Sequence, residues 1–565
     1  MRTRTFRLLA ATAIACATCA LTTSAATART LFVGNQTPGS ISAFSFSTAG
    51  QLSAVPGSPF ASTQQPRGLF SSIDGQRLYS GHRDANVISQ HVVGPTGALS
   101  ALTTDLAFTP GAPGSSAVSP DGRFVYIASL VNNAGFQKFA IAENGALTAA
   151  EVSAVAGNTN GVAITPDGRF IYACTSTQGL FMFSRSADGS ASALAGSPLL
   201  NNSCSALAVT PDGKFLVTAS TNPGVRTYTI NSDGTLTLID DGGITGPLAS
   251  AIELGPDGRS AYVLNIGSAM VGGNVARFSI TGDGIVEPQG TPVTVSDPNA
   301  YAVGMAISPD GRFVVVGVPS ASSNVRVFST AAGALSEVAG SPVSSGANMA
   351  GLSPTLEIAF QTNNGPSVSK LTVGGKDRKR KLTASGGSDP DGAVAEYRWD
   401  FGDGKTATSS ASTISHTYSK AGNYNATVTL VDDEGCGATD IYDGRKYLCN
   451  SSGSASASAT VDARPPSFSK LKLAKRSVAR GGKIKLSYKL SEAATVKVVF
   501  QTRSGKKFRT RGTISFKSKS GKRSKTLTLK IRRRALAKGS YRLLVTGTDS
   551  RANTSSAKKL SLKIR

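Results

Sequence analysis

A short Pro-Asp-Gly motif recurs along the chain and constrains its fold more than any other feature of the sequence. Complete copies begin at Pro120, Pro166, Pro211, Pro256 and Pro309, with steps of 46, 45, 45 and 53 residues between them. Diverged copies occur at 72–77 and at Ser353-Pro354. Seven units of this length predict a repeat architecture in which each unit shares its core with its neighbours.

Each unit contains four segments with β-strand character. An apolar run precedes the motif, as at 161–164, and a β-branched, aromatic run follows it, as at 170–173. Proline fixes φ, aspartate bonds the local backbone and glycine supplies a positive φ, so the motif predicts a hairpin turn. A third run, as at 180–183, and a fourth after another glycine, as at 333–338, complete the unit. Four strands per unit are typical of a propeller blade, and we predict a seven-bladed β-propeller over residues 29–362.

The two ends of the repeat region predict how the ring closes. Residues 31–35 have the pattern of an outer strand that lacks an inner partner, and residues 348–353 have the pattern of an inner strand. Pairing of these two segments would complete the seventh blade and remove the open sheet edges.

Residues 1–28 have the features of a secretory signal peptide. Three arginines are followed by an apolar stretch over residues 8–21 and by the small residues of Ala26-Thr27-Ala28. Cleavage would leave Arg29 at the new terminus, whereas lipid attachment at Cys16 is the alternative. No later stretch approaches 18 apolar residues, so we predict no transmembrane segment. We expect a monomer that is secreted and associated with the cell wall.

A different module follows over residues 364–463. It contains the string Trp-Asp-Phe-Gly-Asp-Gly at 399–404. The segment resembles a PKD domain, a small Ig-like β-sandwich, and the resemblance implies spacing, adhesion or polysaccharide contact rather than catalysis. Trp399 is the only tryptophan and the expected core anchor, with Tyr418 and Tyr424 packed near it.

The four cysteines beyond the leader form two candidate pairs. Cys436 and Cys449 lie in an insertion at 435–458 that departs from the PKD pattern, and we predict a disulfide that closes the loop of 13 residues between them. Cys174 ends a strand of one blade and Cys204 enters a strand of the next. A disulfide is the prediction for this pair as well, with two buried thiols as the alternative.

The sequence predicts no metal site or other cofactor. The three histidines stand at positions 82, 91 and 416, without a His-Glu-x-x-His or paired-cysteine motif that would indicate zinc. Carboxylates at Asp389, Asp391, Asp432 and Asp433 could together bind Ca²⁺. Aspartate in Asp-Gly turns is the more common explanation for these residues.

A strongly basic module occupies residues 466–565. From Ser467 onward, 30 lysines and arginines are balanced only by Glu492 and Asp549, a net charge of +28 (30 − 2) against +25 for the whole chain. Apolar and basic residues alternate, as at 483–486, which predicts a second Ig-like sandwich of about seven strands with a lysine-rich outer surface. The module resembles the C-terminal β-sandwiches of secreted actinobacterial proteins.

The basic surface has three interpretations. Nucleic acid would fit the charge, but aromatic residues are sparse and the module is predicted to be exported, so we expect no nucleic acid partner. An anionic cell-envelope polymer or polysaccharide would fit both the charge and the location. A solvated lysine surface that protects sheet edges is the third interpretation. We favour the envelope polymer.

The repeat units resemble the bacterial propellers grouped with 6-phosphogluconolactonase and the surface-layer YVTN repeat proteins. This resemblance implies lactone hydrolysis in some members and pure scaffolding in others. Hydrolysis needs a base that activates water and donors that stabilise the oxyanion. The strands expected to line the channel carry only one ionisable residue, Glu253.

A candidate catalytic cluster is predicted in the loops at the opposite face from the Pro-Asp-Gly turns. It comprises Arg67, His82, Arg83 and Asp84, with Asp297 from another blade. His82 could act as a base and an arginine could hold an anion, although solvated loop residues explain the same pattern. We therefore predict an all-β, secreted recognition or adhesion protein of the cell envelope, with a lactone hydrolase as the alternative.

Overall fold

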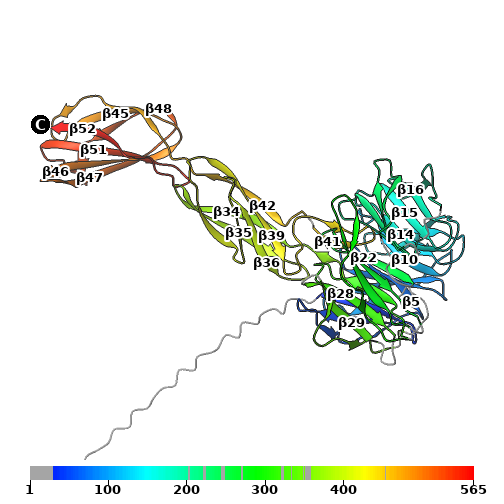
Figure 1. Cartoon of the computed structure of the whole chain (residues 1–565). Coiled ribbons are helices and arrows are strands. Elements are labelled where there is room, and N and C mark those ends of the chain that lie inside the picture. Colours follow the sequence, from blue (N-terminus) through cyan, green and yellow to red (C-terminus); the bar gives the residue numbers. More distant parts are fainter. Residues whose placement is uncertain are drawn as a thin grey trace, which may run out of the picture.

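The regular elements of the computed structural model are β-strands, arranged in three consecutive units (Figure 1). The structure describes residues 29–200, 204–220, 224–242, 248–268, 271–298, 300–319, 324–331, 334–347, 349, 358–451 and 453–565. The leader with Cys16 and the motif copy at Ser353-Pro354 lie outside these residues. The all-β class is confirmed, because these ranges contain no α-helix. Accordingly, the described segments include no helix of the length and apolarity needed to span a membrane.

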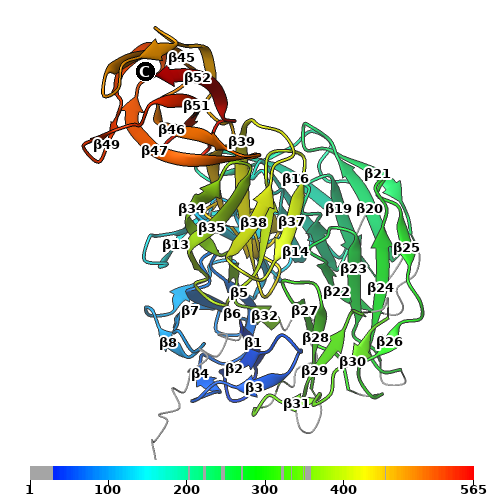
Figure 2. The same ribbon diagram turned by 90° about the vertical axis from the view of Figure 1, so that its left-hand side faces the viewer.

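Seven antiparallel sheets form a ring, which confirms the seven-bladed propeller (Figure 2). The inner strands, next to the channel, are β5 (Pro66–Ser71), β10 (Pro113–Val118), β14 (Thr159–Ile164), β18 (Ala206–Val209), β22 (Ala249–Leu254), β27 (Gly304–Ile307) and β32 (Ile358–Phe360). The second strands are β6 (Arg77–His82), β11 (Phe124–Ser129), β15 (Phe170–Thr175), β19 (Phe215–Ala219), β23 (Ser260–Asn265), β28 (Phe313–Val318) and β1 (Arg29–Asn35).

The outer half of each blade completes the sheets. The third strands are β7 (Val87–Val93), β12 (Phe136–Ile141), β16 (Leu180–Arg185), β20 (Val225–Ile230), β24 (Asn274–Ile280), β29 (Asn324–Ser329) and β2 (Ser40–Phe46). The outermost strands are β8 (Leu99–Ala101), β13 (Leu147–Ser153), β17 (Ala191–Ala193), β21 (Leu236–Asp240), β25 (Val286–Pro288), β30 (Ser336–Glu337) and β3 (Leu52–Ala54). Four short segments also pair with third strands: β4 (Phe60–Ala61), β9 (Leu106–Ala107), β26 (Val293–Thr294) and β31 (Val343–Ser344).

The Pro-Asp-Gly turns form because each one satisfies its own backbone. The Asp121 carboxylate accepts hydrogen bonds from the Ser119 hydroxyl at 2.5 Å and from the Arg123 N–H at 3.1 Å. The Ser119 hydroxyl oxygen accepts from the Phe124 N–H at 3.0 Å. Gly122 has a φ of +65°, which glycine adopts without strain. The same bonds recur in the next two units, so the predicted hairpins are confirmed.

Buried tyrosines of the second strands join each blade to the next. The hydroxyls of Tyr79, Tyr126 and Tyr172 donate to the carbonyls of Gly145, Gly189 and Gly234 at 2.6, 2.5 and 3.0 Å. The space between neighbouring sheets is filled by apolar side chains from both blades. Each sheet is therefore covered on two faces, which a single blade could not achieve alone.

The predicted pairing of residues 31–35 with residues 348–353 is wrong. The strand that pairs with β1 lies farther along the chain and is β32, with Leu31 opposite Phe360 and Val33 opposite Ile358. Side chains of β32 alternate between two cores, because Ile358 and Phe360 pack beside Leu31 while Ala359 packs beside Phe32. Residues 348 and 350–353 lie outside the described part of the chain. The ring is nevertheless closed by its two ends, as expected.

The middle module, residues 364–463, is a sandwich of two sheets. One sheet contains β34 (Ser367–Lys376), β35 (Lys379–Ser388) and β38 (Thr413–Thr417), and the other contains β37 (Thr406–Ser409), β36 (Val394–Asp400), β39 (Asn423–Asp432) and β42 (Ser456–Asp462). Trp399 is buried in the core, and Tyr418 stacks on Tyr424 with ring centroids 4.2 Å apart. A small separate sheet joins β33 (Asn363–Asn364), β41 (Tyr447–Asn450) and β40 (Ile441–Tyr442).

The basic module, residues 466–565, is a second two-sheet sandwich. Its three-stranded sheet contains β43 (Phe468–Leu473), β45 (Lys483–Leu490) and β48 (Gly521–Thr528). Its five-stranded sheet contains β44 (Ser477–Val478), β52 (Lys558–Ile564), β51 (Gly539–Thr548), β46 (Ala494–Ser504) and β47 (Lys507–Ser518). A small hairpin of β49 (Lys530–Ile531) and β50 (Arg534–Ala535) turns through the arginine run.

Buried polar contacts fix the basic module to the middle module. The Arg380 guanidinium is 3% exposed and donates to the carbonyls of Arg551 at 2.7 Å and Asp462 at 2.5 Å. Asn553 donates to the same Asp462 carbonyl at 3.0 Å. The propeller and the basic module consequently lie at opposite ends of the molecule, with the middle module between them (Figure 1).

Carboxylates gather where the middle module meets the propeller. Asn363 donates to Asp432 at 3.0 Å, the Asn364 N–H donates to Asp391 at 2.9 Å, and Arg29 forms an ion pair with Glu434. Burial, together with the neighbouring Asp432 and Asp391, raises the pKa of Asp389 to about 8. At neutral pH this carboxyl group is therefore protonated in the folded protein.

This raised pKa predicts that the protein loses stability as the pH rises. Asp389 in an unfolded chain has a pKa of about 3.9, so folding takes up a proton between about pH 4 and pH 8. The contribution of this group to the free energy of unfolding therefore falls as the pH increases through that window. We expect Asp389→Asn to raise the melting temperature at pH 8.5 and to change it little at pH 4. Scanning calorimetry at both pH values, with Glu287→Gln on an exposed propeller strand as the control, checks this. Equal effects of Asp389→Asn at both pH values would contradict it.

Candidate functional site

A loop of the middle module enters the central channel of the propeller. We call residues 442–447 of this loop the plug. The Tyr442 hydroxyl donates to the Val118 carbonyl at 2.6 Å and the Tyr447 hydroxyl donates to the Pro120 carbonyl at 2.8 Å. Burial raises the pKa of Tyr447 to about 12 and raises that of Tyr442 strongly, so both phenols remain protonated donors. The plug therefore closes the channel at the end that carries the Pro-Asp-Gly turns.

Three consecutive carbonyls of the plug bond to three consecutive blades. Asp443, Gly444 and Arg445 accept hydrogen bonds from the N–H groups of Val209, Ile164 and Val118 at 3.2, 2.7 and 2.8 Å. These donors occupy equivalent positions, immediately before the motif at the end of β18, β14 and β10. An inner strand has an unpaired edge toward the channel, and the plug supplies acceptors for that edge.

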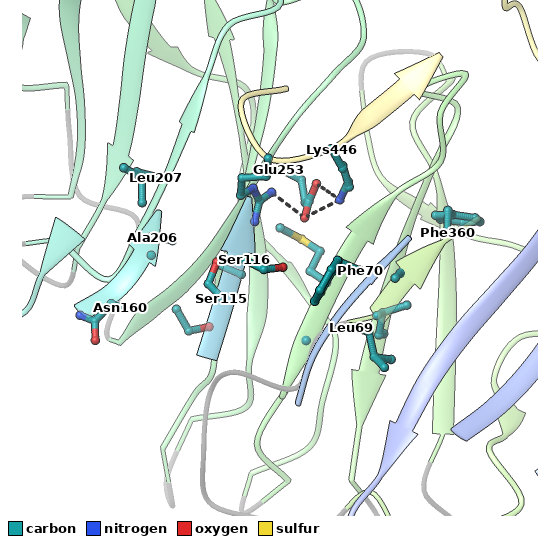
Figure 3. Close-up of a pocket in the computed structure, with 18 of the residues that line it drawn as sticks. Leu69, Phe70, Ser115, Ser116, Asn160, Ala206, Leu207, Glu253, Phe360 and Lys446 are labelled. Atoms are coloured by element: carbon teal, nitrogen blue, oxygen red, sulfur yellow. Dashed lines mark hydrogen bonds and ion pairs between the residues drawn. The ribbon is translucent and has the colours of Figure 1, made fainter. Parts of the chain in front are cut away.

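The charges of the plug pair with Glu253, the only carboxylate on the inner strands (Figure 3). Arg445 donates to its carboxylate at 2.9 Å, and Lys446 donates to both of its oxygens, at 3.1 and 3.3 Å. The Glu253 side chain is only 4% exposed. Both oxygens of this buried carboxylate are therefore engaged by cations of the plug.

The turn of the plug depends on a buried aspartate and a glycine. The Asp443 carboxylate accepts from the N–H groups of Arg445 and Lys446, both at 2.9 Å. Gly444 has a φ of +89°, and a Cβ atom there would lie 2.8 Å from the Val209 nitrogen. Any other residue at this position would therefore strain its own backbone and push against the inner strand.

Beyond the plug, the channel contains a small cavity with both polar and apolar walls (Figure 3). Its walls include Ser115, Asn160, Ser205 and Ser250 from four successive blades, and the plug cations contribute to its lining. The cavity volume is about 60 Å³. That space holds about four water molecules at about 15 Å³ each, whereas sites for small-molecule ligands usually measure roughly 300–1,000 Å³.

The predicted base, His82, is buried at the end of β6 and has no exposed surface. Its Nδ1 lies 3.2 Å from the Gln64 carbonyl, which can only accept, so Nδ1 carries the proton. Its Nε2, 2.9 Å from the Ser80 hydroxyl, is then the acceptor of that hydrogen bond. Burial lowers the pKa of His82, which keeps the ring neutral. Both nitrogens are therefore committed to structural contacts.

Three of the other predicted residues, Arg67, Arg83 and Asp84, lie near His82 in the first complete blade, whereas Asp297 comes from another blade. Arg67 is 2% exposed, and burial and then Arg83 lower its pKa to about 10. Arg83 and Asp84 form a solvent-exposed pair at 3.8 Å, and Asp84 also accepts from Gln65 at 2.5 Å. None of the predicted cluster, Asp297 included, lines the channel cavity formed by described residues.

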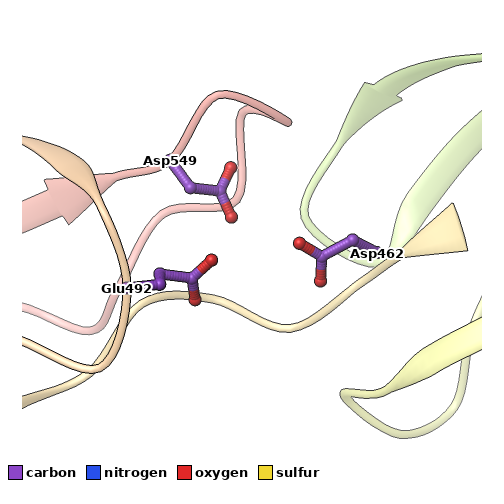
Figure 4. A group of neighbouring side chains, drawn as sticks. All are labelled: Asp462, Glu492 and Asp549. Atoms are coloured by element: carbon purple, nitrogen blue, oxygen red, sulfur yellow. The ribbon is translucent and has the colours of Figure 1, made fainter. Parts of the chain in front are cut away.

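One group of described acidic residues has the spacing of a metal site. Asp462, Glu492 and Asp549 meet where the middle and basic modules join, with one oxygen from each within 4.8 Å of the others (Figure 4). Carboxylate oxygens suit hard cations such as Ca²⁺. Asp549 is already an acceptor for the N–H groups of Arg551 and Asn553 at 2.8 and 2.9 Å. Asp389, Asp391, Asp432 and Asp433, the Ca²⁺ alternative of the sequence, do not form such a group among the described residues.

Both cysteine pairs form disulfides in the structure. Cys174 in β15 bonds to Cys204, which precedes β18, and so links two neighbouring blades. Cys436 bonds to Cys449, with Cα atoms 5.4 Å apart. This second disulfide closes the base of the loop whose tip is the plug.

Sequence reasoning missed the plug, although two signals for it were visible. Glu253 occupies a position where four other inner strands have alanine, namely Ala117, Ala163, Ala208 and Ala306. The loop that Cys436 and Cys449 close contains one Arg-Lys pair, Arg445-Lys446, which could neutralise Glu253. The two segments are 192 residues apart, and nothing in the sequence pattern joins them.

Two families match parts of the chain. Residues 124–241 match the family described as lactonase, 7-bladed beta-propeller, and residues 370–444 match the PKD domain. The second match ends inside the plug, so the family pattern does not extend through the whole insertion.

The curated relatives match this chain in short stretches. The pre-pro-metalloprotease PrtV of Vibrio cholerae is 52% identical over 48 residues, which is 8% of this chain and 5% of that protein. The microbial collagenase of Vibrio alginolyticus is 31% identical over 80 residues, 14% of this chain and 10% of the collagenase.

Solved structures with a similar fold match over the propeller. The periplasmic gluconolactonase PpgL of Pseudomonas aeruginosa aligns with a TM-score of 0.47 at 20% identity, covering 59% of this chain and 99% of that one. A functionally unknown protein of Desulfotomaculum acetoxidans aligns with a TM-score of 0.46 at 16% identity, covering 59% and 99%. The propeller therefore matches the lactonase propeller family over part of its length, and the module that follows it matches the PKD domain.

Proposed function

We propose that this chain is an exported recognition protein of the cell envelope, in which the propeller is a binding platform without catalytic activity. The observation that supports this most strongly is the plug. It closes one end of the channel and neutralises Glu253, the only carboxylate among the inner strands. The described channel therefore lacks a free base, which a hydrolase needs to activate water.

The remaining open end of the propeller suits polar ligands. Hydroxyl and amide groups of Ser115, Asn160, Ser205 and Ser250 line the cavity on that side of the plug. Such groups hydrogen-bond the hydroxyls of glycans without supplying acid–base chemistry. A surface ligand at this face would not need to enter the narrow channel.

The middle and basic modules support attachment of the protein to the cell envelope. The PKD domain spaces the propeller away from the basic module, and buried contacts of Arg380 and Asn553 fix the two sandwiches to each other (Figure 1). A module with a net charge of +28 (30 − 2) attracts anionic polymers of the envelope. We propose that the basic module anchors the protein to the envelope. The two disulfides, one in the propeller and one in the middle module, would stabilise the protein outside the cell.

A second candidate function is hydrolysis of a sugar or aliphatic lactone. The family match over residues 124–241 and the name of the gluconolactonase PpgL favour it. The site would then lie at the loop face around Arg67 and His82. The burial of His82 and the use of both its nitrogens weigh against that role.

A lactonase assay separates these two functions. The chain from Arg29 to Arg565 is titrated in a pH-stat with a panel of sugar and aliphatic lactones, beside Glu253→Gln and His82→Ala. We expect no turnover above background for any lactone, with or without Ca²⁺. Turnover that disappears in either variant would establish the hydrolase and overturn the proposal.

The charge pairing in the channel predicts a strong coupling between Glu253 and the plug. Glu253→Gln removes a buried carboxylate that pairs with two partly buried cations, which should cost about 3 kcal/mol of unfolding free energy. Arg445→Met with Lys446→Met leaves the carboxylate unpaired and should cost a similar amount. The triple variant removes every charge, so its cost should be smaller than the sum of the two by at least about 1 kcal/mol.

This coupling is measured by urea unfolding of the wild type, Glu253→Gln, the double variant and the triple variant. The unfolding is monitored with a signal that reports on the propeller. Arg83→Met serves as the control for loss of an exposed arginine, since its ion pair with Asp84 is solvated. Strictly additive costs in the triple variant would show that the plug charges do not depend on Glu253.

A further inference from the structure

The basic module carries its charge unevenly, and one sheet face has a regular arrangement. The outward side chains of β45 alternate with buried apolar residues such as Ile484 and Leu486, and strands β43 and β48 pair with β45 on either side. We call this outer surface the lysine face. It consists of lysines at 472, 483, 485, 489 and 522 and hydroxyl residues at 469, 487, 524, 526 and 528.

Strand register places these residues in rows across the sheet. Ser469 lies opposite Lys489, which lies opposite Lys522. Lys472 lies opposite Ser487, which lies opposite Ser524. Lys485 and Lys483 lie opposite Thr526 and Thr528. Every row therefore combines at least one ammonium group with at least one hydroxyl group.

This arrangement has an electrostatic cost that the module does not offset internally. Lys489 and Lys522 are directly opposite each other on paired strands, where like charges destabilise a sheet. Among the residues that the structure describes, no ion pair involves a lysine of this face. The only two acidic residues of the module, Glu492 and Asp549, lie together at the junction with Asp462 (Figure 4).

The opposite face of the sandwich differs. There Arg542 covers the Phe508 ring at 3.3 Å and donates to Gln501 at 2.7 Å, so its charge is used within the module. Apolar residues such as Val499 and Leu544 interrupt that surface. The lysine face therefore has a more continuous pattern of cations and hydroxyls than the opposite face.

We propose that the lysine face is the surface that binds an extended, hydroxyl-rich polyanion of the cell envelope, a glycopolymer with repeated phosphate or carboxylate groups. Ammonium groups neutralise the anions, and serine and threonine hydroxyls bond the polymer's own hydroxyls. The face has no aromatic side chain on which bases could stack, which disfavours single-stranded nucleic acid. This inference rests on the proposed attachment function and assigns it to one sheet.

Two charge-matched variants of the chain from Arg29 to Arg565 test the assignment. The first replaces Lys485, Lys489 and Lys522 of the lysine face with Gln. The second replaces Lys497, Lys517 and Lys559, exposed on the opposite sheet, with Gln. Each variant loses three positive charges, so any difference between them reports position and not net charge. Matching melting temperatures confirm that both remain folded.

Binding is measured by sedimentation and fluorescence titration with a glycerol-phosphate polymer, a polyuronate, neutral dextran and a single-stranded DNA, over a series of salt concentrations. We expect the lysine-face variant to lose at least about tenfold in affinity for the anionic polymers and to show a shallower salt dependence, because fewer counterions are released. The opposite-face variant should lose less than about threefold. Comparison of the affinities for the glycerol-phosphate polymer and for the polyuronate identifies whether phosphate or carboxylate is preferred.

Each other outcome has a distinct meaning. No binding of the wild-type chain to any anionic polymer would contradict the proposed attachment function itself. Binding that both variants weaken equally would leave attachment in place and overturn the assignment to the lysine face. Tighter binding to the DNA than to either anionic polymer would overturn the partner chemistry.

Discussion

The structure depends on one set of backbone hydrogen bonds, those between the plug and the inner strands of the propeller. A propeller leaves only short edges at its outer strands, but each inner strand also turns one unpaired edge toward the channel. The carbonyls of residues 443–445 bond to the N–H groups of Val209, Ile164 and Val118, one blade for each residue. This stepwise match connects the PKD domain to three blades of the propeller.

The other features of the channel follow from that contact. Because the plug carries Arg445 and Lys446 into a buried space, a carboxylate is needed there, and Glu253 supplies it in place of the alanine found in other blades. Because the plug approaches Val209 so closely, its turn requires glycine at 444. The cavity that remains is too small for most ligands, which directs recognition to the open face and attachment to the distant basic module.

Much of this fold could be predicted from local sequence patterns. Proline, aspartate and glycine specify the turn at Pro120 within a few residues, and repetition specifies the blade number. Closure was predicted with the wrong strand, because 348–353 and 358–360 are both short apolar runs that local pattern cannot rank. The plug was missed for a related reason. Glu253 and Arg445 are 192 residues apart, in two segments of the chain that share no sequence pattern. The exposure of His82 could not be predicted either, because burial depends on how neighbouring loops pack.

Hydrogen exchange at the inner strands tests the plug most directly. The amides of Val118, Ile164 and Val209 should exchange slowly in the wild-type protein and much faster in Gly444→Ala, where the new Cβ pushes the plug away from Val209. Gly435→Ala is the matched control, because Gly435 has the same φ of +89° but open space around its Cβ position. Slow exchange that persists at all three amides in Gly444→Ala, or equally fast exchange in the control, would contradict the account.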